Sequence, residues 1–342
     1  MKRRDIVVIA ASSGGFHVLR TLAERLPADL PAVVSIVMHI GRHASVLPEL
    51  LSRWGPLPAR FAAHEEAAEN GRIYVAPPDR HLLMGKGRFQ LSVSAAENFA
   101  RPAADPLFRS AAMHFGERVI GVVLSGDLDD GAAGLATIRA HGGYGIVQDP
   151  AKSAMKSMPL AALQAAGADA IVPPDDLGAA IVAAVQGAVR APDFVGTADL
   201  TALRTEAEIG SGERAGLDEL DRIAVRSAIT CPECGGVLWR IRDPRPLRYR
   251  CHTGHAYSVR SLDEAIAQRT EDALWKAIRA VNERMVFARE RRQWAVNSGD
   301  PKAASIEEAR IDEAETLVEV LRASIARTGA SHGPQRAGDD VA

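Results

Sequence analysis

Across residues 1–190, short runs rich in valine, isoleucine and leucine alternate with stretches whose apolar residues recur at helical spacing. Strands that alternate with helices are typical of an α/β fold, and runs this uniformly apolar are typical of strands covered on both faces. The pattern predicts a doubly wound, mostly parallel sheet with helices on both faces. The expected strands span residues 6–11, 32–38, 60–63, 73–76, 119–124, 144–147 and 170–172, and the expected helices span 16–26, 44–54, 106–115, 130–141 and 174–189. Residues 81–85 and 88–92 predict a hairpin added to that sheet.

The pattern changes after residue 190. Polar, acidic residues punctuated by glycine and proline predict a linker, with a short helix near 199–208. A heptad-like apolar seam farther on predicts two helices joined by a turn at 297–301. We favour a hairpin that closes on itself over an intermolecular coiled coil, and oligomerisation through it stays open. The expected domains are a catalytic-type α/β domain at 1–190, a linker at 191–222, a Cys/His module at 223–260, a helical hairpin at 261–328 and a disordered tail at 329–342.

Composition narrows the class of protein. The chain has 342 residues, of which 47% are hydrophobic and 25% charged, with a formal net charge of −2. A globular protein with this balance is no general attractor for nucleic acid or anionic membrane. No apolar run reaches the roughly 18–20 residues that cross a bilayer, so we expect no membrane insertion. All three cysteines fall between positions 231 and 251, which indicates a metal site and a reducing cytoplasm.

The turn AASSGG at residues 10–15 lies between the first predicted strand and the first predicted helix. A serine on a tight strand-to-helix turn is the setting of a nucleophile elbow, and glycines allow the close backbone approach that it needs. Free N–H groups at the start of the next helix favour a developing negative charge there. Ser12 is therefore our candidate nucleophile, although a phosphate-binding or purely structural turn has the same pattern.

Candidate partners for Ser12 follow two other predicted strands. His39 ends the strand at 32–38, and Asp127, Asp129 and Asp130 follow the strand at 119–124. The carboxyl ends of parallel strands lie along one edge, so these side chains can meet. A nucleophilic serine needs a base and a carboxylate that orients the base. The alternatives are a polar loop entry at His39 and, for the aspartates, a helix N-cap or half of a divalent-metal site.

Residues 5–190 resemble the catalytic domain of chemotaxis receptor methylesterases, the CheB family. The family's Gly-Ala-Ser-Thr-Gly-Gly corresponds to residues 10–15, its Gln-His-Met segment to 38–40, and its Leu-Thr-Gly-Met-Gly-x-Asp-Gly-Ala segment to LSGDLDDGA at 124–132. Segments at 74–81, 101–108 and 158–159 also resemble family segments, in the same order. The resemblance implies a catalytic triad of Ser12, His39 and Asp130.

The same resemblance implies hydrolysis of glutamate γ-methyl esters on methyl-accepting chemoreceptors through an acyl-enzyme, without a cofactor for catalysis. Deamidation of receptor glutamines at the same site is also implied. Backbone N–H groups near Ser13 and residue 127 would hold the oxyanion, with Gly14 and Met158 lining the site. The chain begins at the first esterase strand, so we expect a stand-alone form without the receiver domain that precedes this domain in chemotaxis.

Three departures from the family pattern lie beside this chemistry. Ala10 replaces a glycine of the elbow, Asp127 replaces a methionine, and Leu128 replaces a glycine. A carboxylate at position 127 that pointed inward would oppose the oxyanion. The competing interpretation is therefore a non-catalytic or weakly active signalling adaptor that uses the esterase fold for binding.

A second constellation contains the cysteines. CPEC at 231–234 and CHTGH at 251–255 place two Cys on one knuckle and a Cys with a His on another, joined by two short predicted strands. This is the N/S ligand set of tetrahedral zinc, so we predict a zinc ribbon with ligands Cys231, Cys234, Cys251 and His255. His252 is the rival fourth ligand, and buried free thiols are the alternative. Four ligands leave no open position, so the zinc would be structural. The segment resembles the C-terminal module of some stand-alone methylesterase-like proteins.

Residues 222–260 carry eight arginines against two acidic residues. A basic face of this kind suits nucleic acid, an acidic receptor segment or plain solvation. Because the rest of the chain points to receptor chemistry, nucleic acid is not the expected partner.

Overall fold

The computed structural model describes residues 3–40, 43–187, 200–211, 217–242 and 246–331. The chain divides into two compact units, Met1–Leu262 and Asp263–Ala342. The first unit holds a parallel sheet with its helices and a small antiparallel sheet, and most of a helical hairpin forms the second.

The central sheet has seven strands, and every neighbouring pair is parallel. In sheet order the strands are β3 (Ala59–Phe61), β4 (Arg72–Val75), β2 (Val33–Met38), β1 (Ile6–Ala11), β7 (Val119–Val123), β8 (Tyr144–Gln148) and β9 (Ala170–Val172). The predicted α/β sheet is thereby confirmed. The strand order reverses at β1, where the crevice of such a sheet forms.

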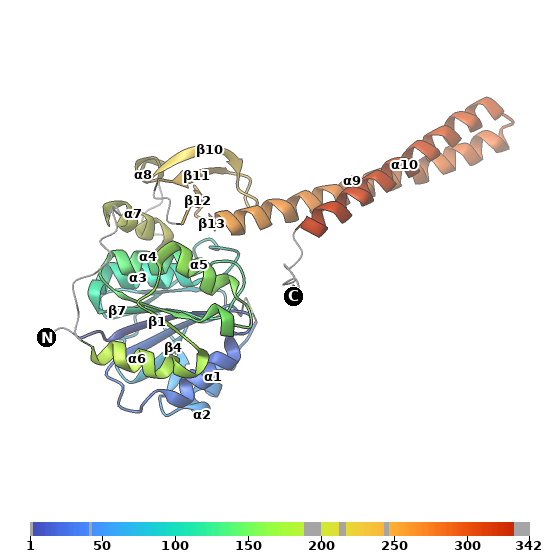
Figure 1. Cartoon of the computed structure of the whole chain (residues 1–342). Coiled ribbons are helices and arrows are strands. Elements are labelled where there is room, and N and C mark those ends of the chain that lie inside the picture. Colours follow the sequence, from blue (N-terminus) through green and yellow to red (C-terminus); the bar gives the residue numbers. More distant parts are fainter. Residues whose placement is uncertain (1–2, 41–42, 188–199, 212–216, 243–245, 332–342) are drawn as a thin grey trace, which may run out of the picture. The chain divides into compact units, whose positions relative to one another are not determined.

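Alternate residues of β1 enter two different cores. Val7 and Ile9 pack with α1 (Gly15–Arg25), α2 (Leu47–Trp54) and α6 (Leu177–Gln186). Val8 and Ala10 pack with α3 (Ala104–Phe115), α4 (Ala132–Ala140) and α5 (Ser157–Ala166). In Figure 1 these two sets of helices cover opposite faces of the sheet. Single-turn 3₁₀ helices lie at Gly116–Arg118, Pro150–Lys152 and Pro174–Asp176. Helix α5 escaped the sequence pattern because its alanine-rich sequence has little contrast between apolar and polar faces.

The predicted hairpin at 81–92 forms, but it does not join the central sheet. Its strands β5 (His81–Met84) and β6 (Phe89–Ser92) pair only with each other within the described residues. Leu82, Met84 and Phe89 are fully buried in the core that also contains α3. The prediction of an added sheet strand was therefore wrong, because the hairpin buries its apolar side chains against a helix.

The predicted linker at 191–222 is more structured than its composition indicated. It contains α7 (Leu200–Ser211) and most of α8 (Leu217–Ile223). Leu203, Glu206 and Ala207 are buried, and α7 contacts α3. Glu206, one of the acidic residues that indicated a solvated linker, is therefore buried inside the first unit. Residues 188–199 and 212–216 lie outside the described part of the chain.

A four-stranded antiparallel sheet follows α8. Its strands pair in chain order: β10 (Ala224–Thr230), β11 (Val237–Ile241), β12 (Arg248–Cys251) and β13 (Ala256–Ser258). Sequence reasoning expected only two short strands here. Trp239 and Ile241 pack with Leu220 and Ile223 of α8 in a small core of their own.

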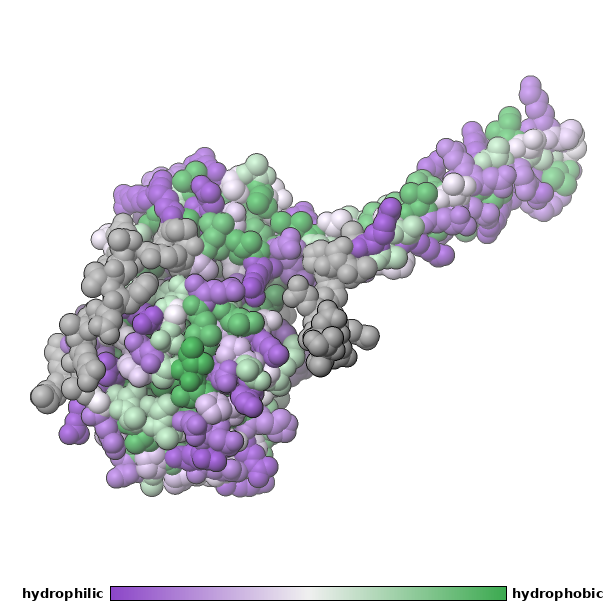
Figure 2. All heavy atoms as spheres, in the orientation of Figure 1, coloured by the Kyte–Doolittle hydropathy of each residue, from purple (hydrophilic) through white to green (hydrophobic). Residues whose placement is uncertain are grey.

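The last two helices, α9 (Val259–Asn297) and α10 (Pro301–Ser331), form the expected hairpin. Ile278 and Val281 of α9 pack against Val318 of α10, so the seam closes on itself. Ion pairs link the helices beside this seam, joining Arg289 to Glu315, Arg291 to Glu307, and Arg292 to Glu308. Figure 2 shows the hairpin surface as largely hydrophilic with scattered hydrophobic positions. Association between copies through it stays a prediction.

No helix in the described ranges is long and apolar enough to cross a membrane. The predicted tail at 329–342 lies almost wholly outside the described residues, which end at 331.

Candidate active site

Ser12 follows β1 directly and lies on a tight turn. Its N–H donates to Ser125 O at 3.0 Å, and its carbonyl accepts from the N–H of Gly15 at 2.8 Å. Gly14 has a φ of 77° and begins α1 as its N-cap. A Cβ atom at Gly14 would lie 2.7 Å from both Ala154 Cβ and Ser125 Oγ, so only glycine fits this turn. The turn holds Ser12 at the carboxyl edge of the sheet, where the residue is half-buried.

Ser12, His39 and Asp130 form a continuous chain of hydrogen bonds. Ser12 Oγ lies 3.1 Å from His39 Nδ1, and His39 Nε2 lies 2.7 Å from Asp130 Oδ2. The three side chains follow β1, β2 and β7, whose registers align at this edge. The His39 side chain is 19% exposed and that of Asp130 only 2%. The imidazole therefore links the half-buried Ser12 to a buried carboxylate.

Asp130 is fixed by the start of α3. Its Oδ2 accepts from the N–H of Ala104 at 2.5 Å, and its Oδ1 accepts from the N–H of Asp105 at 3.2 Å. Asp105 in turn caps α4, because its Oδ1 accepts from the N–H groups of Gly131 and Gly134 at 3.1 and 2.7 Å. The two carboxyl groups thus cap each other's helices, where backbone N–H groups favour negative charge.

The two capping carboxyls differ in their affinity for a proton. Burial works to raise the pKa of Asp130, but the hydrogen bond and charge of His39 and the α3 amides outweigh it and lower the pKa. Burial, together with repulsion from Asp130, raises the pKa of Asp105 to about 8. At neutral pH Asp105 therefore keeps its proton, whereas Asp130 stays ionised beside His39.

The remaining predicted site residues lie around Ser12. Ser13 and Asp127 are exposed at the rim, so the Asp127 carboxylate is in contact with water. Met158 is fully buried, and a Cβ at Gly126 would lie 2.0 Å from its Sδ and 2.7 Å from Ser12 Cβ. Met158 therefore packs behind Ser12 through Gly126. Leu128 has a φ of 59°, in the left-handed region that favours glycine.

Comparison with protein families decides the identity of this domain. The family described as CheB methylesterase matches residues 7–181, which include Ser12, His39 and Asp130. The chain belongs to the CheB methylesterase family.

Individual relatives agree with that assignment. Protein-glutamate methylesterase/protein-glutamine glutaminase 3 of Anaeromyxobacter dehalogenans is 42% identical over 179 residues, which are 51% of this chain and 52% of that protein. A putative protein-glutamate methylesterase/protein-glutamine glutaminase of Leptospira interrogans is 35% identical over 170 residues, 49% of this chain and 88% of that protein. The crystal structure of the Thermotoga maritima CheB methylesterase catalytic domain matches with a TM-score of 0.50 and 29% identity, covering 52% of this chain and 97% of that chain. The chain spans about half the length of the Anaeromyxobacter relative.

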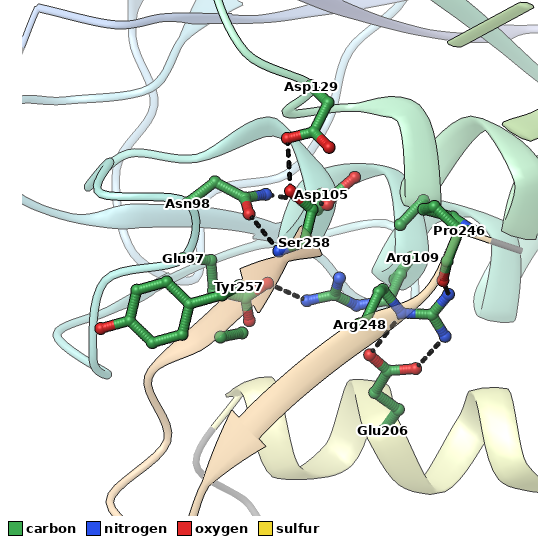
Figure 3. A pocket seen from close by; sticks show the side chains of 12 residues that line it. Glu97, Asn98, Asp105, Arg109, Asp129, Glu206, Pro246, Arg248, Tyr257 and Ser258 are labelled. Carbon is green, nitrogen blue, oxygen red and sulfur yellow. Dashed lines mark hydrogen bonds and ion pairs between the residues drawn. The ribbon is translucent and has the colours of Figure 1, made fainter. Parts of the chain in front are cut away.

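Sequence reasoning missed part of the CheB-type site. Asn98 lies beside both capping carboxyls, and its Nδ2 donates to Asp105 Oδ2 at 3.3 Å and to Asp130 Oδ1 at 3.5 Å. Ser125 Oγ donates to Ser13 O at 2.8 Å and so braces the elbow. Asp105 fell within the family-like segment at 101–108 and could have been singled out there. No local pattern marks Asn98 (Figure 3), whose partners come from distant parts of the chain.

The four predicted metal ligands lie together outside the CheB match. The donor atoms of Cys231, Cys234, Cys251 and His255 are all within 4.8 Å of one another. Cys251 Sγ is 3.7 Å from Cys234 Sγ and 3.4 Å from His255 Nδ1. His252, the rival ligand, instead packs its ring against Trp239 with centroids 6.5 Å apart.

The surroundings of this cluster suit a metal. Glu233 Oε2 lies 3.0 Å from His255 Nε2, which leaves Nδ1 facing the thiols, as a carboxylate behind a metal-bound histidine does. Tyr257 donates to the other oxygen of Glu233 at 2.8 Å. Burial and the neighbouring Cys231 raise the pKa of Cys251 to about 12. A dication would offset this penalty by stabilising thiolates, so the donor set fits zinc.

The basic character of residues 222–260 is partly internal. Arg248 is buried and pairs with Glu206 at 2.7 Å, and Arg250 is buried and pairs with Glu97 at 2.8 Å. The expectation of a basic face is therefore weakened, because these two charges are neutralised inside the first unit and cannot attract nucleic acid.

Proposed function

We propose that this CheB family member is a serine hydrolase that removes methyl groups from glutamate γ-methyl esters of chemoreceptors. The observation that carries the proposal is the continuous hydrogen-bonded chain from Ser12 Oγ through His39 to the buried Asp130. The names of the relatives supply the substrate class, because they are described as protein-glutamate methylesterases and protein-glutamine glutaminases. Deamidation of receptor glutamines at the same site belongs to the proposal.

In this mechanism Ser12 Oγ attacks the ester carbonyl while His39 Nδ1 takes its proton. His39 Nε2–H keeps its hydrogen bond to Asp130, which orients the ring and stabilises the imidazolium. The proton then passes from His39 to the methoxy oxygen, and methanol leaves the acyl-enzyme. Water attacks the acyl group, gives a proton to His39, and Ser12 recovers that proton as it departs.

The oxyanion would be held by backbone N–H groups beside Ser13 and residue 127, at the start of α1 and in the loop after β7. Such donors typically stabilise the transition state by about 3–4 kcal/mol. The exposed Asp127 carboxylate is solvated rather than buried against the oxyanion, which supports a working site. The mechanism uses only the three triad side chains, backbone N–H groups and water, so it needs no cofactor.

The test is release of methanol from receptor helices that carry glutamate γ-methyl esters, with glutamine-bearing helices assayed in parallel for ammonia. We expect methanol from the first and slower ammonia release from the second. If neither product forms at micromolar protein, the hydrolase proposal is wrong.

A signalling adaptor is the second candidate. It is favoured by the loop after β7, where Leu128 replaces a glycine of the family pattern and occupies a left-handed conformation. Tight binding of methylated receptor helices without release of methanol would support the adaptor.

We also propose that Cys231, Cys234, Cys251 and His255 bind a structural zinc ion. Their mutual distances and the Glu233–His255 contact support it. All four donors would be used, so the ion would stabilise the antiparallel sheet rather than activate water. A reducing cytoplasm would keep the thiols available.

A further inference from the structure

Asn98 is oriented by the C-terminal part of the first unit. Its Oδ1 accepts from the N–H of Ser258 at 3.0 Å and from Ser261 Oγ at 2.8 Å. Because only the amide oxygen can accept these bonds, the amide nitrogen must face Asp105 and Asp130. The orientation of this amide thus depends on two serines at the junction of β13 and α9. Figure 3 shows one of them, Ser258, beside Asn98.

Ser258 also holds the loop that carries Asp130. Its Oγ donates to Asp129 Oδ1 at 2.7 Å and accepts from the N–H of Ser261 at 3.0 Å, so it also caps α9. Asp129 precedes Asp130 in the loop between β7 and α4. Ser258, Ser261, Asp129 and Asn98 are all buried, so water does not compete for these bonds.

A buried ion network fixes the loop that carries Asn98. Glu97 pairs with Arg109 of α3 at 2.6 Å and with Arg250 of β12 at 2.8 Å. All three side chains are at most 3% exposed. Burial alone would raise the pKa of Glu97, but the two guanidinium groups lower it strongly, so Glu97 remains charged and paired.

Arg250 also reaches the metal-ligand knuckle. Its Nη1 donates to Gly254 O at 3.0 Å, and the Gly254 N–H donates to Cys251 O at 3.0 Å. Cys251 directly follows Arg250 in the chain, and its N–H donates to His255 O at 2.9 Å. Short contacts therefore run from the Cys/His cluster through Arg250, Glu97 and Asn98 to Asp130.

We propose that the Cys/His module supports the esterase active site: Ser258 and Ser261 hold Asn98 and Asp129, which position Asp130 against His39, and metal at the Cys231 cluster keeps this support in place. Asn98 is a positioning residue in this scheme, since it acts through Asp130. The proposal rests on the proposed hydrolase function for its activity readout alone.

The first test compares Ser261→Ala with Ser227→Ala in the full chain. Ser227 lies on β10 of the same sheet, and its Oγ accepts only a local backbone bond, from Ile229 N at 3.1 Å, among the bonds described. We expect Ser261→Ala to lower kcat for methanol release roughly tenfold or more with little change in KM, because a misplaced catalytic group slows chemistry more than binding. Ser227→Ala should stay near wild type.

The second readout is spectroscopic. The proton between His39 Nε2 and Asp130 should give a downfield imidazole N–H resonance, assigned by its loss in His39→Ala. In Ser261→Ala we expect this resonance to shift or to exchange faster with solvent, whereas in Ser227→Ala it should match wild type. A purely structural role for Ser261 would lower thermal stability without moving the resonance.

The third test addresses the metal. Full-length protein stripped with a chelator should lose the His39 resonance and regain it when Zn²⁺ alone is added back. If stripped protein keeps both the wild-type resonance and the wild-type kcat, the metal has no part in the support. If Ser261→Ala matches Ser227→Ala in both readouts, the proposal as a whole is overturned. Protein that releases no methanol under any condition would contradict the hydrolase function, and the resonance would then decide the support by itself.

Discussion

Asp105 and Asp130 are buried carboxyl groups that share the amide nitrogen of Asn98 but differ in their other partners. Among the described hydrogen bonds, Asp130 accepts from His39 and two backbone amides of α3, whereas Asp105 accepts from the backbone amides of Gly131 and Gly134. The charge of Arg109 lowers the pKa of Asp105, but burial and repulsion from Asp130 outweigh it. One proton between two such groups goes to the group with the weaker cationic environment. This partition keeps Asp130 ionised, which the proposed role beside His39 requires.

The partition predicts a pH dependence of stability. The folded pKa of Asp105 is about 8 against an ordinary value of 3.8, so the folded state keeps a proton that the unfolded chain has lost. The stabilisation that this proton provides is fully present below pH 3.8, the ordinary pKa, and is lost as the pH rises through about 8. Asp105→Asn removes it, so the unfolding free energy of the variant relative to wild type should increase between pH 5 and 8, by at most about 1.4 kcal/mol per pH unit. Urea unfolding across this range checks it, and a constant difference would contradict the partition.

Replacing Leu128 with glycine should make the protein more stable. A φ of 59° is strained for any residue with a Cβ atom, and glycine would relieve this strain. Glycine also gives the unfolded chain more conformational freedom, which offsets part of the gain. Leu128→Gly should therefore raise the unfolding free energy by up to about 1 kcal/mol. The matched reverse change is Gly131→Ala in the same loop, where φ is 87° and a Cβ would lie 3.1 Å from Ala10 Cβ. That variant should lose at least as much. Denaturant unfolding measures both, and a loss of stability in Leu128→Gly would show that the leucine side chain stabilises the loop.

At the scale of elements, the knuckles of the antiparallel sheet depend on Glu233. Its contact with His255 Nε2 fixes the imidazole so that Nδ1 faces the thiols. Glu233→Gln keeps the size of the side chain but removes this charge, so zinc affinity should fall about 10- to 100-fold. Competition with a chelating dye measures the affinity. Glu219→Gln on α8 is the control for the charge change, and equal affinities in the two variants would place Glu233 outside the metal centre.

Elements that repeat a simple pattern could be predicted from sequence, whereas elements that depend on distant partners could not. The strands before Ser12 and His39 are uniformly apolar, so their carboxyl ends were located correctly. The choice of Asp130 over Asp129 came from family resemblance alone, because both follow the same strand. Asn98 and Glu97 carried no signal, since Ser258 lies 160 residues from Asn98 and Arg250 lies 153 residues from Glu97. Arg248 and Arg250 resembled surface charge for the same reason.

At the scale of the first unit as a whole, Glu97 is the shared partner of two buried arginines, one on helix α3 and one on strand β12. Glu97→Gln would remove the carboxylate with which Arg109 and Arg250 form their ion pairs, which should lower the unfolding free energy by about 3–5 kcal/mol. The same change at Glu24, whose pair with Arg20 is exposed, should cost less than about 0.5 kcal/mol. Urea unfolding of both variants checks the contrast, and similar losses would mean that the buried network adds little.

The central claim is that Ser12 attacks the ester, and the adjacent serine offers a close control. Methanol release from methylated receptor helices should be compared for wild type, Ser12→Ala and Ser13→Ala under single-turnover conditions. Ser13→Ala keeps its backbone N–H and the carbonyl oxygen that accepts from Ser125 Oγ, so its rate should fall by less than about tenfold. Ser12→Ala should fall by about 10⁴-fold or more. A Ser12→Ala variant that releases methanol at a rate near that of Ser13→Ala would contradict the account.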